Sequence, residues 1–216
     1  MVDSLGGNNG GRSALTLAAG AGHLDIVDCL VAAGAEVNMP GVRYMGRTPL
    51  QAAAEGGHLP VIQRLLHEGA VINAPPAHDF GRSALTAAAT GQYAAVVEYL
   101  LAHGAHVNAP ITKYKGLTAL QAAASTGNVE IVQLLLHAGA DVDVEGSYLN
   151  GCTALYAAAE GSHDAVVMIL LNAGADTEKT SGNKRRTALQ IAAQQDHASV
   201  VDLLRSRVQQ HAAGQP

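Results

Sequence analysis

A phrase of thirteen residues returns along this chain at a constant spacing. It reads Gly-Arg-Thr-Pro-Leu-Gln-Ala-Ala-Ala-Glu-Gly-Gly-His from Gly46 to His58. The step from each version to the next is 35 residues, and the final step, from Thr153 to Thr187, is 34. Shorter versions of the phrase begin at Gly11, Gly81, Gly116, Gly151 and Arg185. Self-similarity at a fixed period of roughly 20–50 residues predicts a solenoid, in which each repeat packs only on its neighbours.

The composition suits such a stack better than a single globular core. Six units of this length take up nearly all of the 216 residues. Hydrophobic residues make up 48 % of the chain but aromatic residues only 3 %, because much of the apolar content is alanine. Small side chains let thin helix pairs stack closely, so we expect one elongated array.

Charge, cysteine use and hydropathy argue against several classes of protein. The net charge of −5 is unlike that of a general nucleic-acid binder. Cys29 and Cys152 lie more than three repeats apart and cannot pair within one array, so we expect the reducing environment of the cytoplasm. No apolar run reaches the roughly 18 residues of a membrane span, and no charged-then-apolar leader opens the chain. We therefore expect neither membrane contact nor secretion.

Each repeat reads as a helix, a turn, a second helix and an extended loop. A hydroxyl residue stands where an N-cap would satisfy free backbone N–H groups in every unit: Ser13, Thr48, Ser83, Thr118, Thr153 and Thr187. Three residues later, a glutamine can complete a capping box by bonding back to the cap residue's own N–H: Gln51, Gln121 and Gln190. The second helices are aliphatic at helical spacing and end at glycines suited to a left-handed C-cap: Gly34, Gly69, Gly104, Gly139 and Gly174.

Over residues 11–208 the chain resembles the ankyrin repeat. The features that carry the resemblance are the repeated phrase, the paired alanines, the Gly-His pair, the aliphatic helix and the closing Gly-Ala-x-Val-Asn run. The resemblance implies an all-α solenoid of helix-turn-helix units with β-hairpin fingers. The chain departs from the family where glutamine replaces the usual histidine of the helix start. Each unit is also about two residues longer than a typical ankyrin repeat. The excess falls between Asn38 and Gly46 and their equivalents, so we expect extended fingers. The near-identical units further resemble the ankyrin arrays of large fungal signalling proteins.

We predict a simple organisation of the chain. Residues 1–10 are glycine-rich and indicate a flexible lead-in, and residues 209–216 form a C-terminal tail. The six repeats between them span about 11–45, 46–80, 81–115, 116–150, 151–184 and 185–208. The last repeat carries Arg205 and Arg207 where the fourth has Leu136 and Ala138, as a polar terminal cap requires.

The sequence predicts no metal, cofactor or catalytic site. Histidines recur at equivalent places, but stacked helix pairs lie roughly 8–10 Å apart, whereas zinc requires ligands at about 2.1 Å. We interpret them as turn caps: His23, His58, His163 and His197. Cys152 has no histidine or aspartate predictably beside it, and the chain lacks a phosphate-binding glycine loop. We therefore expect a protein that is not an enzyme.

The charged residues divide between the two halves of each repeat. Basic residues gather in the fingers and at the start of the first helices: Arg12, Arg43, Arg47, Arg82, Lys113, Lys115, Lys179, Lys184, Arg185 and Arg186. Acidic residues recur on the second helices: Asp25, Asp28, Glu98, Glu130, Asp164 and Asp202. In the architecture that the resemblance implies, fingers and first helices line the concave face. That face should be locally positive and steer an acidic patch of a protein partner. Alternatively, these side chains only keep the finger edge solvated and free of aggregation.

An apolar and aromatic window interrupts the basic residues in the fourth and fifth repeats. Leu117 and Cys152 stand where other repeats have arginine, and Tyr156 replaces the threonine or glutamine of the first helix. Tyrosine and arginine dominate binding hot spots. The candidate partner-binding residues are this window, the finger tyrosines and the flanking arginines: Tyr44, Arg47, Arg82, Tyr114, Leu117, Tyr148, Cys152, Tyr156 and Arg186.

The sequence thus favours a monomeric, non-catalytic scaffold that binds a protein partner through its concave face and fingers, as the resemblance implies. Two alternatives stay open. One is a small-molecule-binding protein or enzyme with a pocket around Tyr156, which a deep closed cavity there would support. The other is an engineered array without a natural partner.

Overall fold

The computed structural model describes residue 3 and residues 13–40, 46–77, 81–114, 116–147, 151–181 and 185–213. In these residues the chain forms twelve helices and no β-strand, which confirms the all-α prediction. None of these described helices is both long and apolar enough to cross a membrane. The helices are α1 (Ala14–Ala21), α2 (Leu24–Ala32), α3 (Pro49–Glu55), α4 (Leu59–His67), α5 (Ala84–Thr90), α6 (Ala94–Ala102), α7 (Ala119–Thr126), α8 (Val129–His137), α9 (Ala154–Glu160), α10 (Asp164–Asn172), α11 (Ala188–Gln194) and α12 (Ala198–Ala213).

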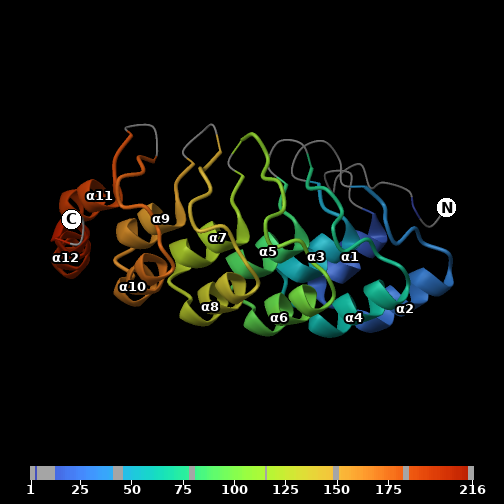
Figure 1. Ribbon diagram of the computed structural model, residues 1–216. Coiled ribbons are helices and arrows are strands. Elements are labelled where there is room, and N and C mark those ends of the chain that lie inside the picture. Colours follow the sequence, from blue (N-terminus) through green and yellow to red (C-terminus); the bar gives the residue numbers. More distant parts are fainter. Residues whose placement is uncertain are drawn as a thin grey trace.

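The helices stack in two rows (Figure 1). The first helices of the repeats lie side by side in the order α1, α3, α5, α7, α9 and α11, and the second helices form the row beneath them. Helices α1 and α12 lie at opposite ends of the array. Each helix pair therefore packs on the pair before it and the pair after it, as the period of the sequence predicts.

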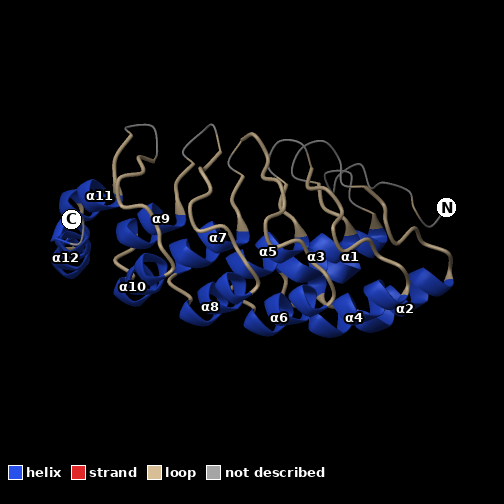
Figure 2. Ribbon diagram, in the orientation of Figure 1, coloured by secondary structure: helices blue, strands red, loops and turns tan. Residues whose placement is uncertain are grey.

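The loops between repeats project beyond the first-helix row, away from the second helices (Figure 2). In the last of these fingers, Ser181 and Arg186 form an isolated antiparallel β-bridge, with N···O distances of 2.8 and 3.0 Å. The sequence predicts hairpin tips at 39–45, 74–80, 109–115 and 144–150, and the structure describes these only in part. Residues 41–45, 78–80, 115 and 148–150 of these tips lie outside the described residues, as does the predicted lead-in apart from Asp3.

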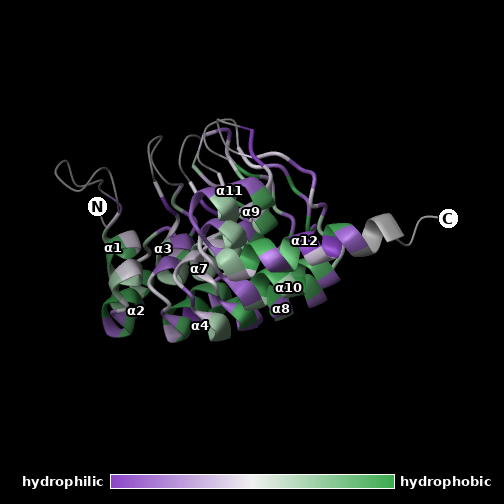
Figure 3. Ribbon diagram, turned by 90° about the vertical axis from the view of Figure 1, so that its left-hand side faces the viewer, coloured by the Kyte–Doolittle hydropathy of each residue, from purple (hydrophilic) through white to green (hydrophobic). Residues whose placement is uncertain are grey.

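Small and branched aliphatic side chains fill the interfaces between repeats. One leucine of each first helix is only 1–2 % exposed in the first five repeats: Leu15, Leu50, Leu85, Leu120 and Leu155. Four residues later an alanine is fully buried: Ala19, Ala54, Ala89, Ala124 and Ala159. Alanine lets neighbouring helices approach closely, so burial is spread over every interface. Figure 3 shows the hydrophobic residues gathered in the helical rows.

Hydroxyl residues cap the first helices, and the three predicted capping boxes are confirmed. At Thr118 the hydroxyl accepts from the N–H of Gln121 at 3.1 Å, and the Gln121 side chain accepts from the N–H of Thr118 at 3.0 Å. The same glutamine also donates through Nε2 to the carbonyl of Val144 at 2.9 Å, in the stem of the finger. Gln51 makes the equivalent bond to Ala74 at 3.1 Å. Glutamine therefore ties the first helix to its finger, which the sequence alone did not show.

Asparagines at the base of the fingers connect consecutive repeats. Asn73 donates through Nδ2 to the carbonyl of Gly104 at 2.9 Å and accepts from the N–H of His106 at 2.8 Å. Asn38 makes the same two bonds one repeat earlier, and Asn108 makes them one repeat later. Backbone groups that follow α4, α6 and α8 are thus satisfied by the preceding repeat. These bonds form a ladder along the array.

The recurrent histidines also join neighbouring repeats. His58 Nε2 lies 3.1 Å from the carbonyl oxygen of Gly20, and His163 Nε2 lies 3.2 Å from that of Ser125. His197 makes a similar contact through Nδ1. Each ring binds the end of the first helix in the preceding repeat, which agrees with their interpretation as turn caps.

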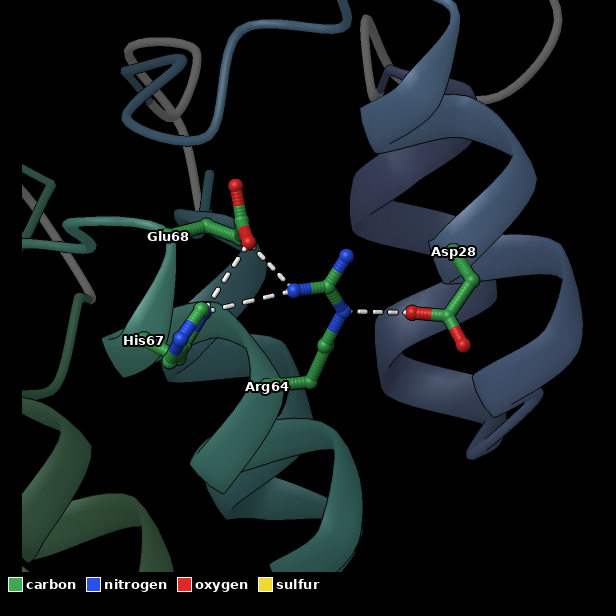
Figure 4. Close-up of polar contacts among 4 residues, drawn as sticks. All are labelled: Asp28, Arg64, His67 and Glu68. Carbon is green, nitrogen blue, oxygen red and sulfur yellow. Dashed lines mark hydrogen bonds and ion pairs between the residues drawn. The ribbon is translucent and has the colours of Figure 1, made fainter.

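An ion cluster on the second helices lies across the first two repeats (Figure 4). Arg64 of α4 donates through Nε to Asp28 of α2 at 2.5 Å and through Nη1 to Glu68. His67 Nδ1 lies 3.1 Å from the Glu68 carboxylate, and hydrogen bonds from His67 and Arg64 lower the pKa of Glu68. Because these groups face solvent, water screens their attraction. The apolar stacking, rather than this cluster, holds the two repeats together.

The last repeat has the polar surface that its sequence predicts. Arg205 is exposed at the position where the preceding repeat has the buried Leu171. Arg207 Nη2 donates to the carbonyl of Leu171 at 3.0 Å and so satisfies an acceptor at the end of α10. The array therefore ends in charged and polar groups rather than in an open apolar face.

The finger tether leads to a stability prediction. Gln121→Ala should lower the free energy of unfolding by about 2 kcal/mol, because it removes a cap bond and takes a donor from the Val144 carbonyl. Gln190→Ala is the matched control, since Gln190 makes the same cap bonds but is exposed and shows no finger contact in the described residues. It should lower the same quantity by about 1 kcal/mol or less. Urea denaturation measures both losses, and equal losses would show that the tether adds nothing.

Candidate functional site

The residues that precede the N-caps form a row along the face made by the first helices and the fingers, which we call the first-helix face. The row is regular because the repeats stack at a constant step. Each of its five described members is half-buried, so part of every side chain faces solvent. They are Arg47, Arg82, Leu117, Cys152 and Arg186. The structure therefore brings five of the nine predicted binding residues into one row.

Two arginines of this row share one carboxylate. Arg47 Nη2 lies 2.6 Å from Glu55 Oε1, and Arg82 Nη1 of the next repeat lies 3.9 Å from the same oxygen. The Arg82 side chain is 37 % exposed, against 20 % for Arg47. Arg47 is thus engaged within the protein, whereas Arg82 makes a longer contact and is more open to solvent.

Sequence reasoning missed Glu55, because the acidic residues singled out there lie on the second helices. A signal was present, since Glu55 is part of the repeated phrase itself and Glu160 occupies the same place three repeats later. The first-helix face, which we expected to be locally positive, thus carries two arginines that share one carboxylate.

A groove opens between α1 and α3 beside the Arg47–Glu55 ion pair. It has a volume of about 390 Å³, with Leu17, Ala21 and Ala52 among its apolar lining residues. Gly20 lines it at the position where the second repeat carries Glu55. Because glycine has no side chain, space stays open here, whereas every later repeat carries a side chain at this position. The sequence showed this glycine but gave no reason to connect it with a groove.

In the fifth repeat, the apolar and aromatic window is more buried than a surface that contacts a partner should be. Tyr156 is 9 % exposed and belongs to the hydrophobic core. Burial raises the pKa of its hydroxyl, Glu160 and Cys152 raise it further, and Arg186 opposes them. Burial, with Glu160, also raises the pKa of the Cys152 thiol to about 11. These four side chains share one neighbourhood, but most of the tyrosine ring is unavailable to a partner.

The structure supplies a reason for the tyrosine at this position. In the second and fourth repeats a glutamine there accepts the N–H of the N-cap residue. In the fifth repeat the N–H of Thr153 donates instead to Ser181 Oγ of the finger at 3.0 Å. Since the finger serine takes over this bond, Tyr156 is free to pack into the core.

The alternative of a ligand pocket around Tyr156 gains no support from three surface hollows of the described residues. They lie between α1 and α3, between the end of α10 and α12, and beside the first two finger stems. None of these three hollows is lined by Tyr156.

The finger tyrosines are only partly described. Tyr114 is half-buried, and Lys113 Nζ lies 5.6 Å from the centre of its ring, within the range of a cation–π contact. Tyr44 and Tyr148 lie outside the described residues. Of the finger aromatics in the predicted site, Tyr114 is therefore the one whose surroundings are known.

Comparisons with known proteins agree on the kind of repeat. A family model described as "Ankyrin repeats (3 copies)" matches residues 2–76, 74–146 and 143–212. The crystal structure of the human ASB11 ankyrin repeat domain superposes with a TM-score of 0.76 at 29 % sequence identity. The alignment covers 91 % of this chain and 84 % of that one. A comparison with the sequences of curated proteins gave no match.

The two cysteines should differ sharply in reactivity. Cys29 is exposed, whereas the Cys152 pKa of about 11 lies two units above the usual 9.0 of a thiol. Only thiolate reacts, so Cys152 should be modified about 100-fold more slowly than an ordinary thiol at neutral pH. A thiol reagent should give one fast phase, which Cys29→Ser removes and Cys152→Ser leaves unchanged. Two fast phases in the unmodified chain would contradict the burial of Cys152.

Proposed function

Because the chain belongs to the ankyrin-repeat family, whose domains are typically non-catalytic protein-interaction modules, we propose that it is a scaffold that binds a protein partner through its first-helix face and fingers. The observation that carries this proposal is the row of half-buried side chains on the first-helix face. Each of those side chains is partly buried in the array and partly open to solvent. A surface ordered in this way loses little conformational entropy when a partner binds.

The charges in this row favour an acidic partner. Arg47 and Arg82 bring two guanidinium groups to one carboxylate, Glu55, which leaves one positive charge uncompensated. The whole chain carries a net charge of −5, so this positive region contrasts with the rest of the molecule. Such a contrast steers an approaching acidic surface to one face.

The flanks and the centre of the row have different roles in the proposal. Arg82 and Arg186 form charged flanks, and Leu117 offers a half-buried apolar contact between them. Tyr114 extends the surface onto the finger, where Tyr44 and Tyr148 are further candidates. Tyr156 supports this surface from beneath rather than serving as its anchor, because its ring lies in the core. An apolar centre with a charged rim is the usual anatomy of a protein interface.

The proposal includes a monomer in a reducing intracellular compartment. Both cysteines are free thiols, and burial raises the pKa of the Cys152 thiol, which disfavours the reactive thiolate. Reduced cysteines persist in such a compartment.

The role of Arg82 can be tested once a partner has been captured with the full chain as bait. Arg82→Ala should slow association about two- to fivefold at low salt, and the difference should shrink as salt screens the charge. Arg205→Ala is the matched control: it removes the same charge from the exposed surface of α12 and should leave the association rate near that of the parent. Stopped-flow or surface-based kinetics would measure these rates. If Arg82→Ala associates as fast as the parent at low salt, the row is not the binding surface.

A further inference from the structure

The first repeat exposes apolar side chains that are buried in every later repeat. Ile26 of α2 is 46 % exposed. Its equivalents at the same position of the next five repeats are only 0–2 % exposed: Val61, Val96, Ile131, Val166 and Val200. Those five side chains belong to the core that the stacked helix pairs share, and their repeats differ from the first in having a preceding helix pair. The exposure of Ile26 therefore marks an interface of the same kind with one side missing.

Neighbouring positions of the first repeat show the same difference. Leu17 is 36 % exposed, whereas Ala52, at the equivalent position of the second repeat, is 7 % exposed. Leu30 is partly buried, and its equivalent Leu65 is fully buried. Ala14 is exposed as well. We call these four residues, Ala14, Leu17, Ile26 and Leu30, the N-terminal stacking face.

The ladder of asparagine hydrogen bonds also extends to a residue that precedes the first repeat. The N–H of Glu36 donates to Asp3 Oδ1 at 3.1 Å. One repeat later, the N–H of Val71 donates to Asn38 Oδ1 at 2.8 Å in the same way. Asp3 precedes Asn38 by 35 residues, so it stands in register as the ladder residue of a repeat before the first. Asp143 shows that aspartate can take this place, because it accepts the N–H of Asp176.

The opposite end of the array does not match this face. There Arg205 stands exposed at the position of Leu171, and Gln190 is exposed where Gln121 is 1 % exposed. A second copy packed head to tail would thus place the apolar face of one chain against the polar cap of another. The chemistry of the two ends disfavours that arrangement.

We propose that the N-terminal stacking face binds a further ankyrin-type helix pair, placed in register one repeat before α1 and α2. The face continues the five interfaces already present in the array, with the same residue positions and the same ladder register. The occupant presents to Leu17 and Ile26 the surface that each repeat of this chain presents to its successor. Asp3 then stands at the finger base of the added pair, as Asn38 stands at the finger base of α1 and α2.

The test adds such a pair to the full chain. A copy of residues 81–106, joined directly to Val2 in place of Met1, keeps the 35-residue step because Val107 is the equivalent of Val2. The added pair should raise the melting temperature by about 3 °C or more. It should also slow the labelling of Cys29, which is exposed, whereas its equivalents Arg64 and Tyr99 are half-buried.

Ile26→Lys supplies the control. In the chain without the added pair this substitution should shift the melting temperature little, since Ile26 is already 46 % exposed. In the extended chain it should abolish both the gain in melting temperature and the protection of Cys29. The two results together would support docking on the stacking face.

Three outcomes would overturn the proposal. The first is an added pair that changes neither the melting temperature nor the labelling of Cys29, including a pair that stays unfolded. The second is a gain that survives Ile26→Lys. The third is a parent chain that sediments as a dimer and that Ile26→Lys converts to a monomer, because the face would then belong to a second copy.

Discussion

Contact between consecutive repeats is the interaction on which the whole structure depends. A single helix pair of this chain has too few large apolar residues to form a core of its own. Stacking buries Leu50 and Ala54 against the neighbouring pairs and leaves them 1 % and 0 % exposed. The small first-helix side chains make this close approach possible. The same constraint explains why the two ends of the array need separate solutions, with a polar cap at α12 and an open apolar face at α1.

The position of the proposed recognition surface follows from the same contacts. Gln51 and Gln121 fasten finger stems to first helices, and asparagines such as Asn73 fasten each finger base to the next repeat. The glutamine bonds hold finger stems beside the starts of the first helices, and the asparagine bonds hold consecutive finger bases together. Arg82 and Leu117 each stand just before the N-cap of a first helix, so the distance between them is set by the stacking of the repeats. The surface offered to a partner is thus ordered by the bonds that hold the array together.

The sequence predicted the stacked fold well because period, N-caps and helix ends are local properties. Thr118 and Gln121 lie three residues apart, so their capping box could be inferred directly. The site was harder to predict because it depends on distant pairings. The burial of Tyr156 accompanies a bond between Thr153 and Ser181, 28 residues away. Likewise, the charge of the first-helix face depends on Glu55 lying between arginines of two different repeats, which no local pattern reveals.

Amide hydrogen exchange, resolved along the full chain, tests the nearest-neighbour account most directly. Stability in such an array is the sum of repeat and interface terms, so a helix pair with one neighbour opens more readily than a pair with two. The account predicts that residues 14–32, which form α1 and α2, exchange faster than residues 84–102, which form α5 and α6. Slower exchange in α1 and α2 than in α5 and α6, or one common rate for all twelve described helices, would contradict it.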